Sequence, residues 1–122
     1  MKKIIKYRGR DVITGHWAYG YYYPSKTHHI IRDGDDNETI VLEKTIGEYI
    51  NLTDDCDTQI YEGDVVNVKY TLKDAWGDLF QKDNDIIIKW NDETLRYNNP
   101  YDAAFSDGRG AAVKVIGNIY EK

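Results

Sequence analysis

The chain has 122 residues, of which 41% are hydrophobic and 30% charged, and this length and balance suit one folded domain spanning residues 1–122. Its formal net charge of −5 argues against a protein that wraps duplex nucleic acid, because such binding depends on neutralising phosphates. Eleven tyrosines and three tryptophans against two phenylalanines indicate half-exposed sheet and contact surfaces rather than a dry core.

The sequence also predicts the compartment. Cys56 is the single cysteine, so an internal disulfide bond is ruled out. The first residues lack the apolar run of a signal peptide, and no stretch approaches the ~20 apolar residues that span a bilayer. We therefore expect a cytoplasmic protein that does not enter a membrane.

Alternating apolar and polar residues predict short strands in the first half of the chain. Thr14 and Gly15 provide a turn after the first strand, Pro24 ends the second, and the acidic stretch Asp33–Glu38 is a solvated loop. Residues 44–50 fit a helical turn or a strand, and their β-branched side chains favour the strand. The other predicted strands are residues 3–8, 16–23, 28–32 and 39–42.

The stretch Ile60–Leu72 is expected to organise the rest of the fold. Gly63 lies where the backbone must reverse, and glycine reaches positive φ without a steric cost. The residues after it alternate, with Val66 and Val68 on one face and Asn67 on the other, which is typical of a half-buried strand.

The last third of the chain is less regular. Residues 73–85 have no clean period and are interpreted as a long hairpin loop, with a helical turn near Trp76 as one possibility. Strands are predicted over residues 86–90 and 93–97, joined by a reversal at Asn91-Asp92, and a last strand over residues 112–116. Asn99 and Pro100 suit the start of a short helix over residues 99–105. Many short strands between such turns favour a small, partly closed barrel or a strongly bent antiparallel sheet.

Three separated stretches of the chain resemble the YopX family, whose members are small proteins carried by bacteriophages and prophages. Together they run through nearly the whole sequence in the family's order. The matching residues are Lys6–Asp11 with Thr14-Gly15 and Trp17–Gly20, then Thr45–Tyr49 with Ile60–Val66, and last Val115–Glu121.

The resemblance implies a mainly β fold of SH3-like barrel type and a phage or prophage origin. It implies no activity and no catalytic residue, because the function of the family is not established. Two positions depart from the family pattern: Ile50-Asn51 stands where the family has Thr-Gly, and Cys56-Asp57 where it has Asn-Gly. Asparagine tolerates the left-handed backbone conformation, so the first departure is mild.

One row of aromatic residues on the predicted strand 16–23 stands out as a possible binding surface. One interpretation is a stacking platform for single-stranded nucleic acid, flanked by the basic residues of the first strand. The other is a wall of the core, which is favoured because every strand of such a fold must bury one face. The residues concerned are Trp17, Tyr19, Tyr21 and Tyr23, with Lys6, Arg8 and Arg10 beside them.

No metal site, cofactor site or catalytic residue is predicted. Asp33, Asp35 and Asn37 match part of a calcium loop, but Glu38 and Lys44 stand where that loop needs Gly and Glu. A zinc site would need His16 close to the adjacent pair at residues 28–29, whose side chains face opposite sides of a strand. The acidic neighbours of Cys56 would raise the pKa of its thiol, which opposes a nucleophilic role.

The leading hypothesis is a non-enzymatic phage accessory protein that binds a host or phage protein. Tyrosine-rich surfaces, the negative net charge and the missing catalytic set favour it. Exposed sheet edges also allow self-association by strand addition. The alternative is a single-stranded nucleic-acid-binding protein that uses the aromatic row and the basic first strand.

Overall fold

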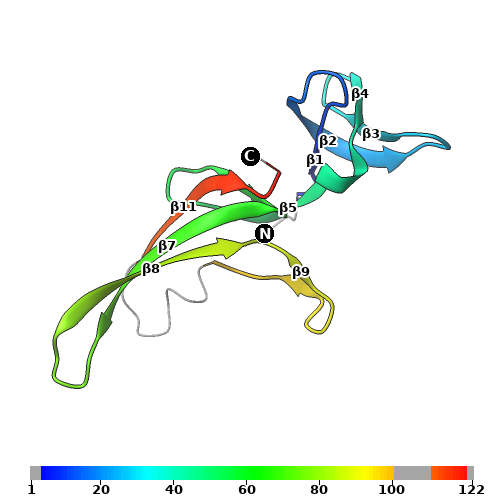
Figure 1. The fold of residues 1–122 in the computed structure, drawn as a ribbon. Coiled ribbons are helices and arrows are strands. Elements are labelled where there is room, and N and C mark those ends of the chain that lie inside the picture. The colour runs from blue at the N-terminus through cyan, green and yellow to red at the C-terminus, as the bar shows by residue number, and fades with distance from the viewer. Residues whose placement is uncertain (1–3, 101–110, 121–122) are drawn as a thin grey trace. The chain divides into compact units, whose positions relative to one another are not determined.

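The computed structural model describes residues 4–100 and 111–120, and the chain divides into two compact units, residues 1–51 and 52–122 (Figure 1). Each unit is described by itself. The prediction of a single domain stays a prediction.

Unit 1 is an antiparallel sheet whose strand order is β4-β3-β2-β1-β5. A 3-10 turn, η1 (Glu43–Thr45), precedes the last of these strands. Residues 44–50 thus contain both predicted alternatives, a helical turn followed by a strand. The strands are β1 (Tyr7–Arg10), β2 (Trp17–Pro24), β3 (His29–Arg32), β4 (Glu38–Val41) and β5 (Gly47–Thr53).

The sheet of unit 1 bends so strongly that the end of β4 meets the end of β1. The Val12 N–H donates to the Ile40 carbonyl at 3.1 Å, and the Leu42 N–H donates to the Arg10 carbonyl at 2.9 Å. A glycine is required on β1 for this approach, because a Cβ on Gly9 would lie 2.8 Å from a methyl carbon of Val41. The bend encloses a small core, which consists of Ile31, Val41, Thr45 and Tyr49.

Unit 2 is built around a three-stranded antiparallel sheet with the order β11-β7-β8. β5 runs across the boundary between the units and is followed by β6. Val66, Val68 and Val113 are fully buried on one face of the sheet, and each such side chain stabilises the fold by about 1.5–3 kcal/mol. The strands are β6 (Gln59–Tyr61), β7 (Asp64–Lys73), β8 (Leu79–Ile87), β9 (Trp90–Asn91), β10 (Arg96–Tyr97) and β11 (Ala111–Asn118).

The predicted organising stretch is confirmed. Gly63 has φ 92° and connects β6 to β7, and its N–H donates to the Ile88 carbonyl at 2.8 Å. The Gly63 carbonyl accepts from the Ile119 N–H at 2.9 Å, while the Asp64 carbonyl accepts from the Ile88 N–H at 2.9 Å. This turn therefore binds two segments, at Ile88 and Ile119, that are far from it in sequence.

A buried carboxylate performs a similar task at the β5–β6 turn. Asp54 accepts hydrogen bonds from the backbone N–H groups of Cys56, Thr58 and Val115 at 2.8–2.9 Å. Burial alone would raise the pKa of Asp54, but these three hydrogen bonds outweigh it and hold the pKa below its ordinary value. The next carboxylate, that of Asp55, accepts from the Val113 N–H at 2.7 Å.

The two departures from the family pattern fall at left-handed backbone positions. Asn51 and Asp57 both have φ 63°. Asn51 also accepts a hydrogen bond from the Ile4 N–H and donates to the Ile4 carbonyl, at 2.8 and 3.0 Å. The expectation that Asn51 tolerates this conformation is confirmed.

The predicted loop over residues 73–85 is wrong. A tight turn at Asp74–Asp78 leads into β8, which pairs with β7 along nine residues, so the strand predicted over 86–90 begins earlier and ends at Ile87. The strand was missed because the residues of β8 are mostly polar, and an exposed edge strand does not require the alternation of apolar and polar residues that predicts strands. The predicted helix 99–105 lies largely outside the described residues. Of the strand predicted over residues 3–8, residue 3 lies outside them, residues 4–6 are not in a strand, and β1 begins at Tyr7 and continues to Arg10.

The fold class is mainly β, as predicted, and its strand pairs are antiparallel. Among the described strands no closed barrel forms, so the SH3-like barrel is not confirmed. No helix in the part of the chain described here is long and apolar enough to cross a membrane.

The Gly63→Ala substitution is expected to destabilise the protein by about 1–3 kcal/mol, since alanine is strained at φ 92°. Its Cβ would also lie 2.8 Å from a ring carbon of Tyr120. Gly15→Ala is the matched control, because Gly15 has φ 76° but open space around it. Urea unfolding should rank Gly63→Ala as the more destabilising change, and equal losses would contradict the role of the Tyr120 contact.

The Asp54→Asn substitution is expected to cost about 1–3 kcal/mol, because one amide oxygen cannot accept all the bonds that two carboxylate oxygens accept. Since the pKa of Asp54 is lowered by folding, its contribution is complete above the unfolded pKa of about 4 and is lost as the pH falls through the folded pKa. Unfolding measured from pH 7 to pH 2 should therefore show a flatter acid limb for the variant. Asp57→Asn, at an exposed position of the same turn, is the matched control and should cost less than Asp54→Asn in urea unfolding at pH 7.

Candidate functional site

The register of β1 and β2 brings the predicted basic and aromatic residues onto one face of unit 1. Arg10 lies opposite Trp17, and Arg8 lies opposite Tyr19. Side chains directly opposite each other in an antiparallel pair project from the same face. On the other side of β2, Tyr21 lies opposite Arg32, a residue that the sequence analysis did not include.

Cations and rings alternate across this face of unit 1, which we call the aromatic–cationic face. The guanidinium carbons of Arg8 and Arg10 lie 4.3 and 4.9 Å from the ring centre of Trp17, so this indole is contacted by both. The ammonium of Lys6 lies 5.6 Å from the ring centre of Tyr19. Such contacts are worth about 0.5–1 kcal/mol each at exposed sites and more when desolvated. They fix the positions of long side chains that would otherwise be mobile.

The favoured core interpretation of the aromatic row is wrong for its middle. Tyr19 is 43% exposed and Tyr21 65% exposed, while Trp17 and Tyr23 are half-buried. The opposite side of β2 is the one that packs inward, where Tyr22 lies opposite the buried Ile31. Tyr19 and Tyr21 therefore lie outside the core of unit 1.

The basic residues are less available than the sequence suggested. Arg8 is only 5% exposed, and Lys6 and Arg10 are half-buried. Arg32 is exposed but donates to Glu38 at 3.0 Å. Tyr23 also donates to Glu38, and this hydrogen bond raises the pKa of the Tyr23 hydroxyl and lowers the pKa of Glu38.

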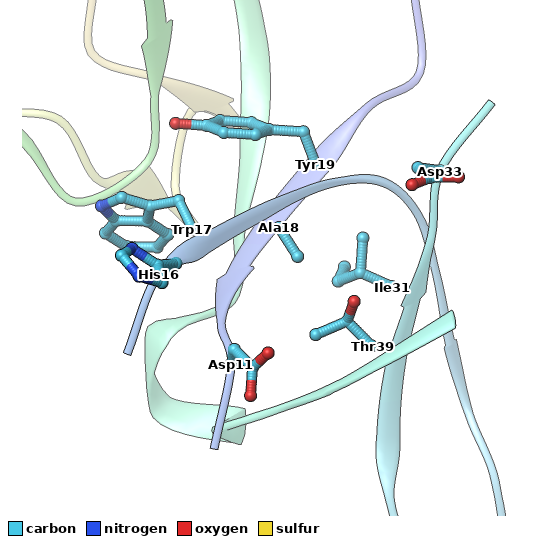
Figure 2. Close-up of a pocket in the computed structure, with 8 residues that line it drawn as sticks. All are labelled: Asp11, His16, Trp17, Ala18, Tyr19, Ile31, Asp33 and Thr39. Carbon is cyan, nitrogen blue, oxygen red and sulfur yellow. The ribbon is translucent and has the colours of Figure 1, made fainter. Parts of the chain in front are cut away.

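A hollow of about 350 Å³ adjoins the aromatic–cationic face (Figure 2). Ala18, Ile31 and Thr39 converge in the middle of the view, and Trp17 and Tyr19 come from β2 at one side. Asp11, His16 and Asp33 lie between strands and Thr39 lies in β4, and none of these polar residues was singled out from the sequence as a binding surface. Its lining residues are Asp11, His16, Trp17, Ala18, Tyr19, Ile31, Asp33 and Thr39.

Two carboxylates at this hollow are held as anions by their own turns. Asp11 accepts from the backbone N–H groups of Ile13 and Thr14, and the Ile13 bond lowers the pKa of Asp11. Asp33 accepts from the N–H groups of Asp35 and Asn37, and the Asn37 bond lowers the pKa of Asp33. Negative charge therefore persists here through the neutral pH range.

The loop compared with a calcium loop is the tip of the β3–β4 hairpin, as the favoured interpretation predicted. It closes through the Asp33 N–H and the Asn37 carbonyl at 3.0 Å. Among the described residues, no group of three His, Cys, Asp or Glu side chains is placed to hold a metal ion.

One of the histidines considered for zinc has other partners. The Nδ1 atom of His29 lies 2.6 Å from the Tyr22 hydroxyl, and its Nε2 atom lies 3.4 Å from Glu43. The Tyr22 and His29 rings also stack at 5.8 Å. His16 instead lines the hollow, and His28 is exposed.

These features define a class: an antiparallel β protein that presents a rigid row of tyrosines beside an acidic hollow. The chain belongs to the YopX family, since the family model described as YopX protein matches residues 6–122. No curated protein and no solved structure matches the chain.

A double-mutant cycle tests the contact between Arg10 and Trp17. The combined Arg10→Met and Trp17→Leu changes should give a coupling energy of about 0.5–1 kcal/mol in urea unfolding, because they remove one cation–π contact. Arg10→Met combined with Tyr21→Leu is the control and should be additive, since that pair is not opposed in the sheet. Equal coupling in both cycles would refute the contact.

Proposed function

We propose that this chain is a non-enzymatic protein-binding module, an accessory protein of phage or prophage origin that acts in the cytoplasm of a host cell. The observation that carries the proposal is the exposed pair Tyr19 and Tyr21 on β2, with the ammonium of Lys6 over the ring of Tyr19 and the guanidinium of Arg8 over the adjacent Trp17. The origin and the compartment are supported by the family resemblance and by the sequence.

Exposed tyrosines on a rigid strand are well suited to a protein contact. A tyrosine offers a large apolar ring and a hydroxyl while losing the freedom of few side-chain bonds on binding. Tyr, Trp and Arg carry most of the binding energy in measured interfaces. Tyr19 and Tyr21 project from the same face of β2, so one partner segment can cover both.

The hollow specifies the chemistry of the partner. Asp11 and Asp33 supply negative charge at its lining, while the rings of Trp17 and Tyr19 project from the other side of β2 (Figure 2). A lysine or arginine side chain suits these two carboxylates, because it donates charge-assisted hydrogen bonds. We therefore propose that the partner offers a basic side chain beside the apolar groups that cover the tyrosines.

Single-stranded nucleic acid is the second candidate, and the alternation of rings and cations is the observation that favours it. The cations count against it, because Arg8 is buried and Arg32 is paired with Glu38. The acidic hairpin tip with Asp35 and Asp36 would repel phosphates. Unit 1 has eight Lys and Arg against seven Asp and Glu, so it has no strongly positive field.

Selection of random-sequence peptides on the immobilised full chain tests the proposal. We expect enriched peptides with a basic residue next to apolar residues, and binding that Tyr19→Ser with Tyr21→Ser weakens at least tenfold. Asp11→Asn with Asp33→Asn keeps one acceptor oxygen for each turn but removes both charges, so it should weaken binding most at low salt.

Trp76→Ser is the matched control, because Trp76 is 87% exposed in the turn between β7 and β8, and its loss should leave peptide binding unchanged. A fluorescent oligothymidine titrated at low salt distinguishes the second candidate. Salt-dependent binding of the oligonucleotide that Tyr19→Ser with Tyr21→Ser abolishes, without any enriched peptide, would replace the protein partner with nucleic acid.

A further inference from the structure

β8 is an open edge strand in unit 2. It is the last strand in the order β11-β7-β8, and no described strand lies on its other side. Among the described residues, the pairing of β11 with β7 runs up to Tyr70, and the pairing of β7 with β8 continues beyond it to Lys73 and Leu79 (Figure 1). Leu79, Phe80 and Ile87 are about half exposed. A long exposed edge of this kind is a template for pairing with another chain.

Backbone directions show which residues of β8 face the open side. The N–H and carbonyl of Ile88 both bond toward β7, to Asp64 and Gly63. Because these groups alternate along a strand, the odd-numbered residues of β8 face away from β7. The Ile87 carbonyl confirms this, since it accepts from the side-chain amide of Asn98 at 2.8 Å. Asn98 occupies that end, which leaves Gln81, Asp83 and Asp85 to present their backbone groups at the open edge.

The side chains of β8 are symmetric about Asp83. Two apolar residues, Leu79 and Phe80, begin the strand, and two more, Ile86 and Ile87, end it. The five residues between them are polar. A two-fold axis at Asp83 therefore places Phe80 opposite Ile86 of a second copy, and apolar residues meet at both ends.

We propose that β8 pairs with β8 of a second copy of this chain, antiparallel and with the two-fold axis at Asp83. The pairing joins Asp83 to Asp83, and Gln81 to Asp85 in both directions, with about six backbone hydrogen bonds. The product is a continuous six-stranded sheet with the order β11-β7-β8-β8-β7-β11 and an isologous interface. This dimer is independent of the tyrosine face on unit 1.

Neighbouring registers fit less well. An axis at Lys82 would oppose two lysines and place Phe80 against Asn84. An axis at Asn84 would set Lys82 against Ile86. The registers centred on Lys82 and Asn84 also place the backbone groups correctly, so the side chains select among the three registers. The apolar matches favour Asp83.

The like-charge pair at the axis is offset by its neighbours on β7. Lys69 lies opposite Asp83 in the register, so the central row across the dimer reads Lys69, Asp83, Asp83, Lys69. The side-chain amide of Asn67 also donates to both Asp83 and Asp85, which holds these carboxylates in place. An attractive pair of opposite charges, Lys69 and Asp83, therefore lies on each side of the axis.

Cross-linking of single cysteines tests the proposed register in the full chain. In a Cys56→Ser background, Asp83→Cys should form a disulfide-linked dimer on mild oxidation, because paired Cα atoms across the axis are about 5.5 Å apart. Gln81→Cys alone and Asp85→Cys alone should cross-link at least tenfold less, while the Gln81→Cys, Asp85→Cys double variant should cross-link as well as Asp83→Cys. Equal cross-linking at all three single positions would overturn the proposal in favour of unspecific contact.

Sedimentation over a range of concentrations provides the second readout. The wild-type chain should pass from one to two chains per particle, and Gln81→Pro should remain monomeric at every concentration. Proline at residue 81 removes only an N–H that faces the open edge, so circular dichroism should stay unchanged. Asp83→Asn should strengthen the dimer severalfold by removing the like-charge pair. A wild-type chain that stays monomeric, or a dimer that survives Gln81→Pro, would overturn the proposal.

Discussion

Unit 2 depends on the left-handed turn at Gly63. Its N–H and carbonyl bind two segments, at Ile88 and Ile119, that follow β8 and β11, and the adjacent Asp64 carbonyl completes the connection. These bonds set the start of β7 against both of its neighbours, so the register of the whole sheet follows from them. A side chain at this position would collide with Tyr120, which packs over the turn. The same residue thus fixes backbone direction and packing.

Hydrogen bonds that carboxylates accept from backbone N–H groups are the second interaction that holds the short strands together. Asp54 and Asp55 accept from N–H groups of β11, and Asp64 accepts from the N–H of Tyr61. The bonds to β11 satisfy N–H groups on an outer strand of the sheet, and the bond to Tyr61 satisfies a buried donor. Acidic residues therefore stabilise the fold of unit 2, which has fourteen Asp and Glu against eight Lys and Arg. The net charge reflects this architecture as much as any partner.

The sequence was informative wherever a local rule decides the structure. Gly63 and the valines after it predicted the organising hairpin, and Asn51 predicted a left-handed position. It failed for β8, whose polar residues form a strand only because β7 lies beside them. The aromatic row was misplaced for a related reason: alternation gives two faces but not which one is inside. That choice depends on how far the sheet bends, which a glycine such as Gly9 permits through its close contact with Val41.

The two candidate surfaces differ in the physical source of their selectivity. On unit 1, side chains provide it, because cations contact Trp17 and Tyr19 and the adjacent hollow is acidic. On unit 2, backbone groups of β8 provide the attraction, and any strand could satisfy them. Selectivity at an edge must then come from the matching of side chains along the strand, and Lys82 and Asp83 in the middle of β8 oppose most other pairings. A strand whose apolar residues lie at both ends, with charges at the centre, fits its own reverse better than an arbitrary sequence.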